Sequence, residues 1–143
     1  MSRYLLDTSI ISNVTKPVPS ESLLAWMAGQ ADEDLFIASL TAAEIWRGVL
    51  EKPAGKKREQ LEAWFSGPEG PLALFAGRVL PFDAKAGIVW ARLMAEGTAA
   101  GRPRSVRDTI IAGIAEANGC IIVTGDESGF PGIPVLNPMR MAI

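Results

Sequence analysis

The sequence contains no histidine and only one cysteine, and these two features exclude several kinds of active site. Without histidine there can be no Ser-His-Asp or Cys-His catalysis and none of the common histidine-containing zinc sites. The single Cys120 excludes an internal disulfide and a multi-cysteine zinc site, and it lies in an apolar run where a thiol is usually inert. Any catalysis must therefore use carboxylates, lysine, arginine or hydroxyl groups.

Long apolar runs and a strong net charge are also lacking. No apolar run approaches the roughly 20 residues that a membrane-spanning helix needs. Asp7 interrupts the first apolar residues before a signal-peptide core of about 7 to 15 residues can form. We therefore expect no membrane helix and a cytoplasmic location. The net charge of −2 does not favour a nucleic-acid partner, although basic residues gather at 52–58 and 102–107. The first of these clusters is equally compatible with a solvated helix face.

The order of apolar patterns predicts a fold of alternating strands and helices. With 143 residues, 48% of them hydrophobic, the chain can bury one core, so we expect a single domain over residues 1–143. Strands are expected at 4–6, 35–38, 78–81, 121–123 and 134–136. Helices are expected after the first strand, at about 20–29, 41–52, 56–65 and 84–96, and over a segment that ends at Asn118. Strands that are apolar on both faces predict a three-layer α/β/α fold with a central, mostly parallel sheet of four to five strands.

Two details of this prediction concern the ends of helices. Thr41 and Glu44 have the spacing of a capping box, in which a threonine begins the helix and an acid three residues later caps it in return. This predicts a helix that begins at Thr41. Residues 97–103 are expected to form a flexible connection between two helices.

Four acidic residues occupy related places in this pattern. Asp7 and Asp126 directly follow predicted strands, Glu44 begins a helix, and Asp108 lies in the first turn of another. Because parallel strands end at one edge and crossover helices run antiparallel to them, we expect all four at the carboxyl edge of the sheet. Carboxylates this close repel one another unless protons or cations compensate, and Mg²⁺ or Mn²⁺ suits oxygen ligands. Such a metal site can hydrolyse phosphodiesters.

Each acidic residue also has a purely structural explanation. Asp7 is compatible with a turn, Glu44 with the acceptor half of the capping box, and Asp108 with a first-turn acid that interacts with the helix dipole. Asp126 is compatible with a solvated loop, and the neighbouring Glu127 could take its place. The constellation is therefore more informative than any single member.

Several short motifs occur in an order that resembles one known family. The matching segments are Leu5-Leu6-Asp7-Thr8-Ser9-Ile10, Ala43-Glu44-Ile45-Trp46-Arg47-Gly48, Asp108-Thr109-Ile110-Ile111-Ala112 and Val123-Thr124-Gly125-Asp126. Leu80-Pro81-Phe82-Asp83 and Leu136-Asn137-Pro138 support them. In this order and spacing they resemble the PIN-domain family, specifically VapC-type toxin ribonucleases of type II toxin-antitoxin pairs, and the last two are similar to the FitB-like subgroup.

The resemblance implies an activity, partners and site residues. It implies a metal-dependent endoribonuclease that uses Mg²⁺ or Mn²⁺ and acts on RNA as a toxin that inhibits translation or growth. It also implies a homodimer and an antitoxin whose tail wraps the toxin and obstructs the acidic pocket. The implied metal ligands are Asp7, Glu44 and Asp108, with Asp126 completing the pocket and Thr8, Ser9 and Thr124 as neighbouring polar groups. Gly125 stands where relatives often have a basic residue, so a contact to substrate phosphate falls to Arg102, Arg104 or Arg107. Asp83 is not expected to take part.

Other classes of protein are compatible with the same acids. One is a non-catalytic α/β binding or signalling module with a magnesium-binding acidic pocket, but a receiver-type module would need a lysine after a late strand, and none follows Val123 directly. Others are a PIN-like fold that has lost catalysis and an unrelated carboxylate-metal phosphatase or DNA nuclease.

Overall fold

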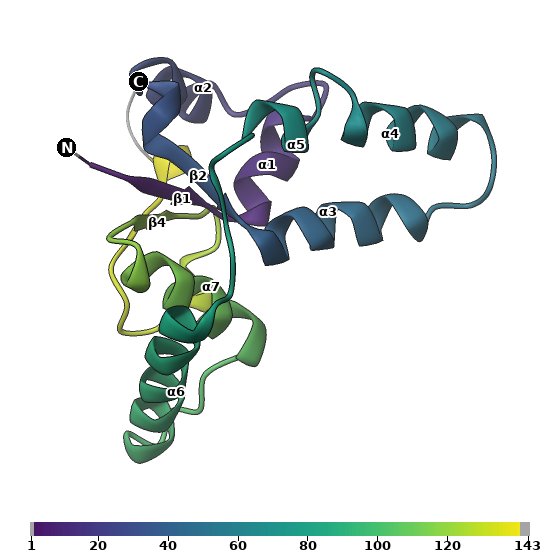
Figure 1. The fold of residues 1–143 in the computed structure, drawn as a ribbon. Coiled ribbons are helices and arrows are strands. Elements are labelled where there is room, and N and C mark those ends of the chain that lie inside the picture. The colour runs from purple at the N-terminus through teal and green to yellow at the C-terminus, as the bar shows by residue number, and fades with distance from the viewer. Residues whose placement is uncertain (1, 141–143) are drawn as a thin grey trace.

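The computed structural model describes residues 2–140 and contains one sheet of five short parallel strands (Figure 1). The strands are β1 (Tyr4–Leu6), β2 (Leu35–Ala38), β3 (Val79–Leu80), β4 (Ile121–Val123) and β5 (Val135–Leu136). Their order across the sheet is β3-β2-β1-β4-β5, and each neighbouring pair is parallel. The prediction of a central parallel sheet is therefore confirmed.

Helices cover both faces of this sheet, because alternate residues of each central strand point to opposite sides. Leu5 and Ile122 belong to one buried cluster together with residues of α6 (Ala84–Ala99) and α7 (Val106–Ala117). Leu6 and Val123 belong to the other cluster. That cluster includes residues of α1 (Thr8–Val14), α2 (Glu21–Ala28) and α3 (Ser39–Leu50). It also includes Phe75, the residue that directly follows α5 (Pro71–Leu74). The predicted three-layer α/β/α arrangement is confirmed, and Figure 1 shows α6 and α7 together below the strands, with α1 and α2 above them.

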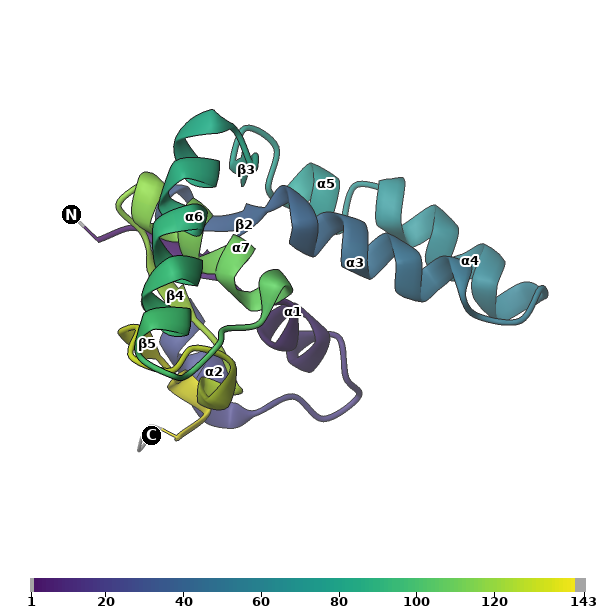
Figure 2. The same cartoon turned by 90° about the horizontal axis from the view of Figure 1, so that it is seen from below.

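An arm formed by α3 and α4 (Lys56–Ser66) extends from the body of the molecule (Figures 1 and 2). α3 begins at the end of β2, and α4 returns alongside it. The rings of Trp46 and Phe65 join the two helices, with centroids 4.8 Å apart. The first two turns of α3 therefore lie at the carboxyl edge of the sheet.

The predicted capping box at Thr41 is wrong. α3 begins two residues earlier, at Ser39, with Ala38 as its N-cap. Thr41 is fully buried inside the helix, and its hydroxyl has no hydrogen-bond partner among residues 2–140. The strand β2 leads directly into the helix, so burial of residue 41 outweighed its capping preference. Glu44 is consequently free to turn its carboxylate elsewhere.

The connection before α7 is shorter than expected. α6 continues through Gly97 to Ala99, three residues beyond the predicted end. Gly97 allows this because a Cβ there would lie 2.8 Å from the Arg102 carbonyl oxygen, so the returning chain packs directly on the helix. Within residues 2–140, no helix has both the length and the apolar composition needed to cross a bilayer.

The described part of the chain also contains three short 3₁₀ helices: η1 (Asp32–Asp34), η2 (Glu127–Gly129) and η3 (Pro138–Arg140). Of these, η2 directly follows Asp126, beyond the end of β4, and it lies beside the residues described next.

Candidate active site

The candidate site lies where the strand order changes direction. β1 is central, with β2 and β3 on one side and β4 and β5 on the other. Open α/β sheets bind ligands beyond the carboxyl ends of their strands at such a point. Asp7 follows β1 there, and its backbone N–H donates to the Val123 carbonyl of β4 at 2.9 Å.

Asp7 is held in place by groups distant in the sequence. It is only 5% exposed, and although it precedes α1 its side chain makes no capping hydrogen bond. Instead, Oδ2 accepts a hydrogen bond of 3.0 Å from the Thr124 hydroxyl, and Oδ1 accepts one of 3.3 Å from Arg107 Nη2. A buried carboxylate needs such partners. The turn explanation therefore does not account for this side chain.

Glu44 faces the same pocket from α3. Oε1 accepts hydrogen bonds from the Thr8 hydroxyl at 2.8 Å and from Arg107 Nη2 at 2.7 Å, and Oε2 accepts from Arg107 Nε at 2.6 Å. Burial alone would raise the pKa of Glu44, but the hydrogen bonds from Arg107 and Thr8 and nearby positive charge lower it below its usual value of 4.5. Glu44 is therefore anionic at neutral pH.

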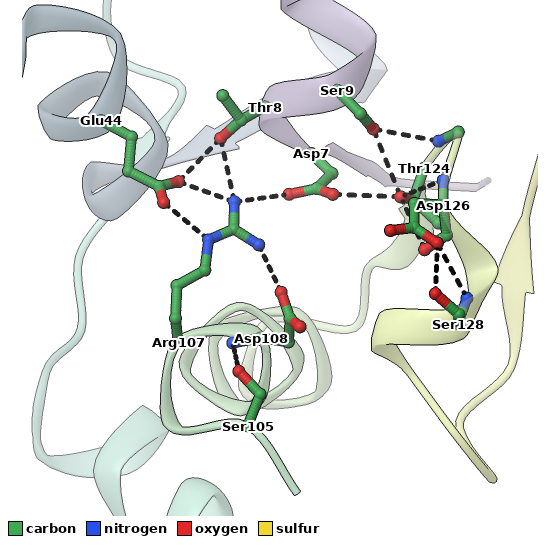
Figure 3. Close-up of polar contacts among 11 residues, drawn as sticks. Asp7, Thr8, Ser9, Glu44, Ser105, Arg107, Asp108, Thr124, Asp126 and Ser128 are labelled. Carbon is green, nitrogen blue, oxygen red and sulfur yellow. Dashed lines mark hydrogen bonds and ion pairs between the residues drawn. The ribbon is translucent and has the colours of Figure 1, made fainter. Parts of the chain in front are cut away.

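Arg107 and Asp108 complete the group from the first turn of α7. Ser105 caps this helix by accepting a hydrogen bond from the Asp108 N–H at 3.2 Å. The Arg107 guanidinium also pairs with the Asp108 carboxylate, so it contacts three carboxylates (Figure 3). Its hydrogen bond to Glu44, assisted by the negative charge around it, raises the pKa of Arg107, and the side chain is permanently charged.

Hydroxyl groups connect the two halves of the pocket. Arg107 Nη2 donates to the Thr8 hydroxyl at 3.2 Å. The Ser9 hydroxyl lies 3.3 Å from that of Thr124 and accepts from the Gly125 N–H at 3.0 Å. The structure thus brings all three predicted hydroxyl residues beside the acids.

Asp126 lies at the edge of this group. Unlike the other three acids, it makes no ion pair with Arg107; its Oδ1 accepts a hydrogen bond of 3.2 Å from the Ser128 N–H and so caps η2 (Figure 3). Its own N–H donates at 3.1 Å to the Thr124 hydroxyl that holds Asp7. Glu127 instead pairs with Arg140 at 2.9 Å. The geometry therefore favours Asp126 over Glu127 as the fourth acid.

The other predicted basic residues are not brought to the acids. Arg104 donates to the carbonyl oxygens of Leu93 and Pro131, and Arg102 lines a small hollow beside them. Asp83 caps α6 by accepting from the Ala86 N–H at 3.0 Å, which is a structural role. Contacts of Arg102 and Arg104 with RNA stay predictions.

Two residues that position Asp108 were missed from the sequence. Ser105 carried a signal, because a serine three residues before an acid in a first helical turn has the spacing of an N-cap. Gly129 carried none: it packs so closely that a Cβ there would lie 2.8 Å from Asp108 Oδ2. A groove of about 370 Å³ also adjoins the pocket and is lined by Thr8, Glu44 and residues of α1, α3 and α4.

The donor chemistry of the pocket suits a hard divalent cation, because carboxylate and hydroxyl oxygens are the ligands that Mg²⁺ and Mn²⁺ accept. Three carboxylates already surround one cationic group, the Arg107 guanidinium. Among residues 2–140, no three acidic side chains form a closed metal-binding cluster. The Arg107 guanidinium lies between the carboxylates of Asp7, Glu44 and Asp108. These carboxylates therefore fit a metal ion if the Arg107 side chain moves out of the pocket.

Comparison with known proteins gives consistent matches over nearly the whole chain. The family model of the PIN domain matches residues 4–135. VapC ribonuclease Y4jK of Sinorhizobium fredii is 37% identical over 140 residues, covering 96% of this chain and 99% of that protein. Toxin FitB of Neisseria gonorrhoeae is 32% identical, covering 94% and 96%. Among solved structures, FitAcB from N. gonorrhoeae has a TM-score of 0.88 at 31% identity, covering 96% of this chain and 99% of that one. DNA-bound VapBC from Salmonella typhimurium has a TM-score of 0.73 at 27% identity, with the same coverage.

Proposed function

The chain belongs to the PIN-domain family, and from that membership we propose that it is a metal-dependent endoribonuclease, the toxin of a toxin-antitoxin pair, acting as one PIN domain over residues 1–143. The observation that carries the proposal concerns the carboxylates of Asp7, Glu44 and Asp108. All three contact one cationic group, the guanidinium of the neighbouring arginine in α7, at the switch point of the sheet. VapC ribonuclease Y4jK, which matches nearly the whole chain, is named as a ribonuclease, and so is Ribonuclease VapC14, which matches 52% of it. Both names favour hydrolysis over a non-catalytic binding or signalling module.

PIN-domain ribonucleases use divalent metal ions, and we propose Mg²⁺ or Mn²⁺ for this one. When bound, the ion would polarise the phosphoryl group and lower the pKa of a water molecule. Asp7 is suited to be a fixed ligand, since burial and the Thr124 hydroxyl leave its carboxylate little freedom. Glu44 is suited to ligation because its low pKa keeps it anionic. Asp108 would be the third ligand and Asp126 would complete the pocket.

The substrate phosphate carries negative charge into a pocket that is already acidic. Arg107 is the positive side chain nearest to these acids, with three carboxylate contacts. It is therefore the chain's best candidate for binding the scissile phosphate, ahead of Arg102 and Arg104.

The proposed partners follow from the same family membership. We propose an RNA substrate, and hence action in the cytoplasm, together with a cognate antitoxin that obstructs the pocket and a homodimer. Large exposed apolar side chains are present for such contacts, including Ile88 at 74% exposure and Leu74 at 56%. The molar mass of the free chain can be measured by light scattering. A value of twice the monomer mass would support the dimer, and the monomer mass at all concentrations would oppose it.

The central test is cleavage of total RNA by the purified protein with Mg²⁺ or Mn²⁺. We expect cutting that is lost with EDTA and in Asp7→Asn. Asp83→Asn is the matched control, because it makes the same chemical change at a helix cap where asparagine serves equally well. If folded protein without antitoxin cuts no RNA in either metal, the nuclease assignment fails.

A further inference from the structure

The centre of the acidic pocket is filled by the chain's own Arg107. Its guanidinium donates two hydrogen bonds to Glu44 in a bidentate pair, at 2.6 and 2.7 Å. It also donates to Asp7 Oδ1 at 3.3 Å and pairs with Asp108. Figure 3 shows the guanidinium between the three carboxylates. The pocket thus already contains a cation that belongs to the protein.

This cation cannot leave by losing a proton, because an arginine side chain stays charged at any ordinary pH. A bidentate arginine–carboxylate pair is also among the stronger charge-assisted hydrogen-bonded contacts in proteins. A metal ion that binds the same oxygens must therefore displace the guanidinium. The three carboxylates accommodate only one cation at a time, since Arg107 and a divalent ion at the same centre would repel each other.

The placement of Arg107 makes such a displacement feasible. Arg107 directly precedes Asp108 in the first turn of α7, so its backbone is fixed beside the pocket. Its side chain is 37% exposed, whereas that of Asp7 is 6% exposed. The guanidinium can therefore move outward toward solvent while the acids stay in place.

We propose that Arg107 is a tethered counter-ion that holds the carboxylates together without metal and competes with the divalent ion for them. The proposal rests on the proposed function in one respect, the identity of the metal pocket. Arg107 then lowers the apparent metal affinity and stabilises the metal-free protein. Once displaced, its positive charge stays at the mouth of the pocket, where the substrate phosphate must enter.

The test is Mn²⁺ binding measured by calorimetry without RNA, at constant ionic strength. The proteins are the wild type, Arg107→Ala and Arg107→Gln, which keeps the length of the side chain and removes its charge. Arg92→Ala is the matched control, since Arg92 also pairs with two carboxylates, Glu96 and Glu116, outside the pocket. We expect roughly tenfold tighter Mn²⁺ binding in both Arg107 variants and wild-type affinity in the control.

Thermal unfolding supplies a second, independent readout. In EDTA, the Arg107 variants should melt at a lower temperature than the wild type, because three carboxylates lose their counter-ion. Saturating Mn²⁺ should raise their Tm more than it raises that of the wild type. Arg107→Gln keeps the test decisive if Arg107→Ala does not fold.

Several results would overturn the proposal. They are unchanged or weaker Mn²⁺ binding in Arg107→Gln, undetectable Mn²⁺ binding in every variant, and an equal gain in affinity in Arg92→Ala. The proposed function fails separately: if the wild type binds Mn²⁺ as expected but cuts no RNA, the counter-ion role stands and the ribonuclease assignment does not.

Discussion

Thr124 is the residue on which the alignment of the pocket depends most directly. Its fully buried hydroxyl donates to Asp7 at 3.0 Å, accepts from the Asp126 N–H at 3.1 Å and lies 3.3 Å from the Ser9 hydroxyl. Thr124→Val replaces this hydroxyl by a methyl group of similar size. The variant therefore removes the hydrogen bonds with little change in packing.

The cost follows from the environment of Asp7. A hydrogen bond to a charged group contributes about 1.5 to 3 kcal/mol, and its loss leaves a carboxylate oxygen buried against a methyl group. We therefore expect Thr124→Val to lower the free energy of unfolding by about 2 to 3 kcal/mol. For a chain of this length, that corresponds to a fall in Tm of about 7 to 10 °C.

Urea unfolding and thermal melts followed by circular dichroism, both in EDTA, measure this change. Thr98→Val is the matched control, because Thr98 is exposed and its hydroxyl donates only to the Met94 carbonyl of its own helix. The control should stay within about 0.5 kcal/mol of the wild type. If Thr124→Val lowers the Tm by less than about 2 °C, the view that this hydroxyl anchors Asp7 is refuted.

Two further predictions concern the other acids. The lowered pKa of Glu44 implies stability that is fully present above its usual value of 4.5 and is lost as pH falls through the lower folded value. The gap in urea midpoint between wild type and Glu44→Gln should therefore narrow as pH falls below 4.5, and a constant gap down to pH 3 would contradict this. Gly129→Ala must push the Asp108 carboxylate aside, so RNA cleavage should fall at least about tenfold while the protein stays folded. Gly87→Ala, with only Phe82 nearby at 3.9 Å, should leave cleavage unchanged and stabilise α6 by about 0.5 to 1 kcal/mol; equal activity in both variants would argue against a role for Asp108.

Much of the fold could be predicted because its signals are local. Apolar runs such as 35–38 and 121–123 are short, and they are separated by patterns of helical period. Gly119 marks the end of α7 with a φ of +66°, a conformation that glycine adopts without strain. Alternation of strands and helices then permits few arrangements other than a parallel sheet covered on both faces.

The helix starts were less predictable, because local preferences compete with burial. The spacing of Thr41 and Glu44 is locally correct for a capping box, yet the helix begins at Ser39 and residue 41 is buried. Tertiary packing decided between two conformations that differ little in local energy. The same shift released Glu44 for the pocket.

The sequence by itself determined which acids gather, because the carboxyl ends of parallel strands share one edge, and Asp7, Glu44 and Asp108 are all tied to that edge by their elements. Only the tertiary structure decided what lies between them. Arg107 has a long side chain whose direction depends on neighbours 63 and 100 residues away, and Asp126 turned its carboxylate to its own loop. Backbone position follows from patterns along the chain, but the pairing of charged side chains follows from distances that exist only after folding.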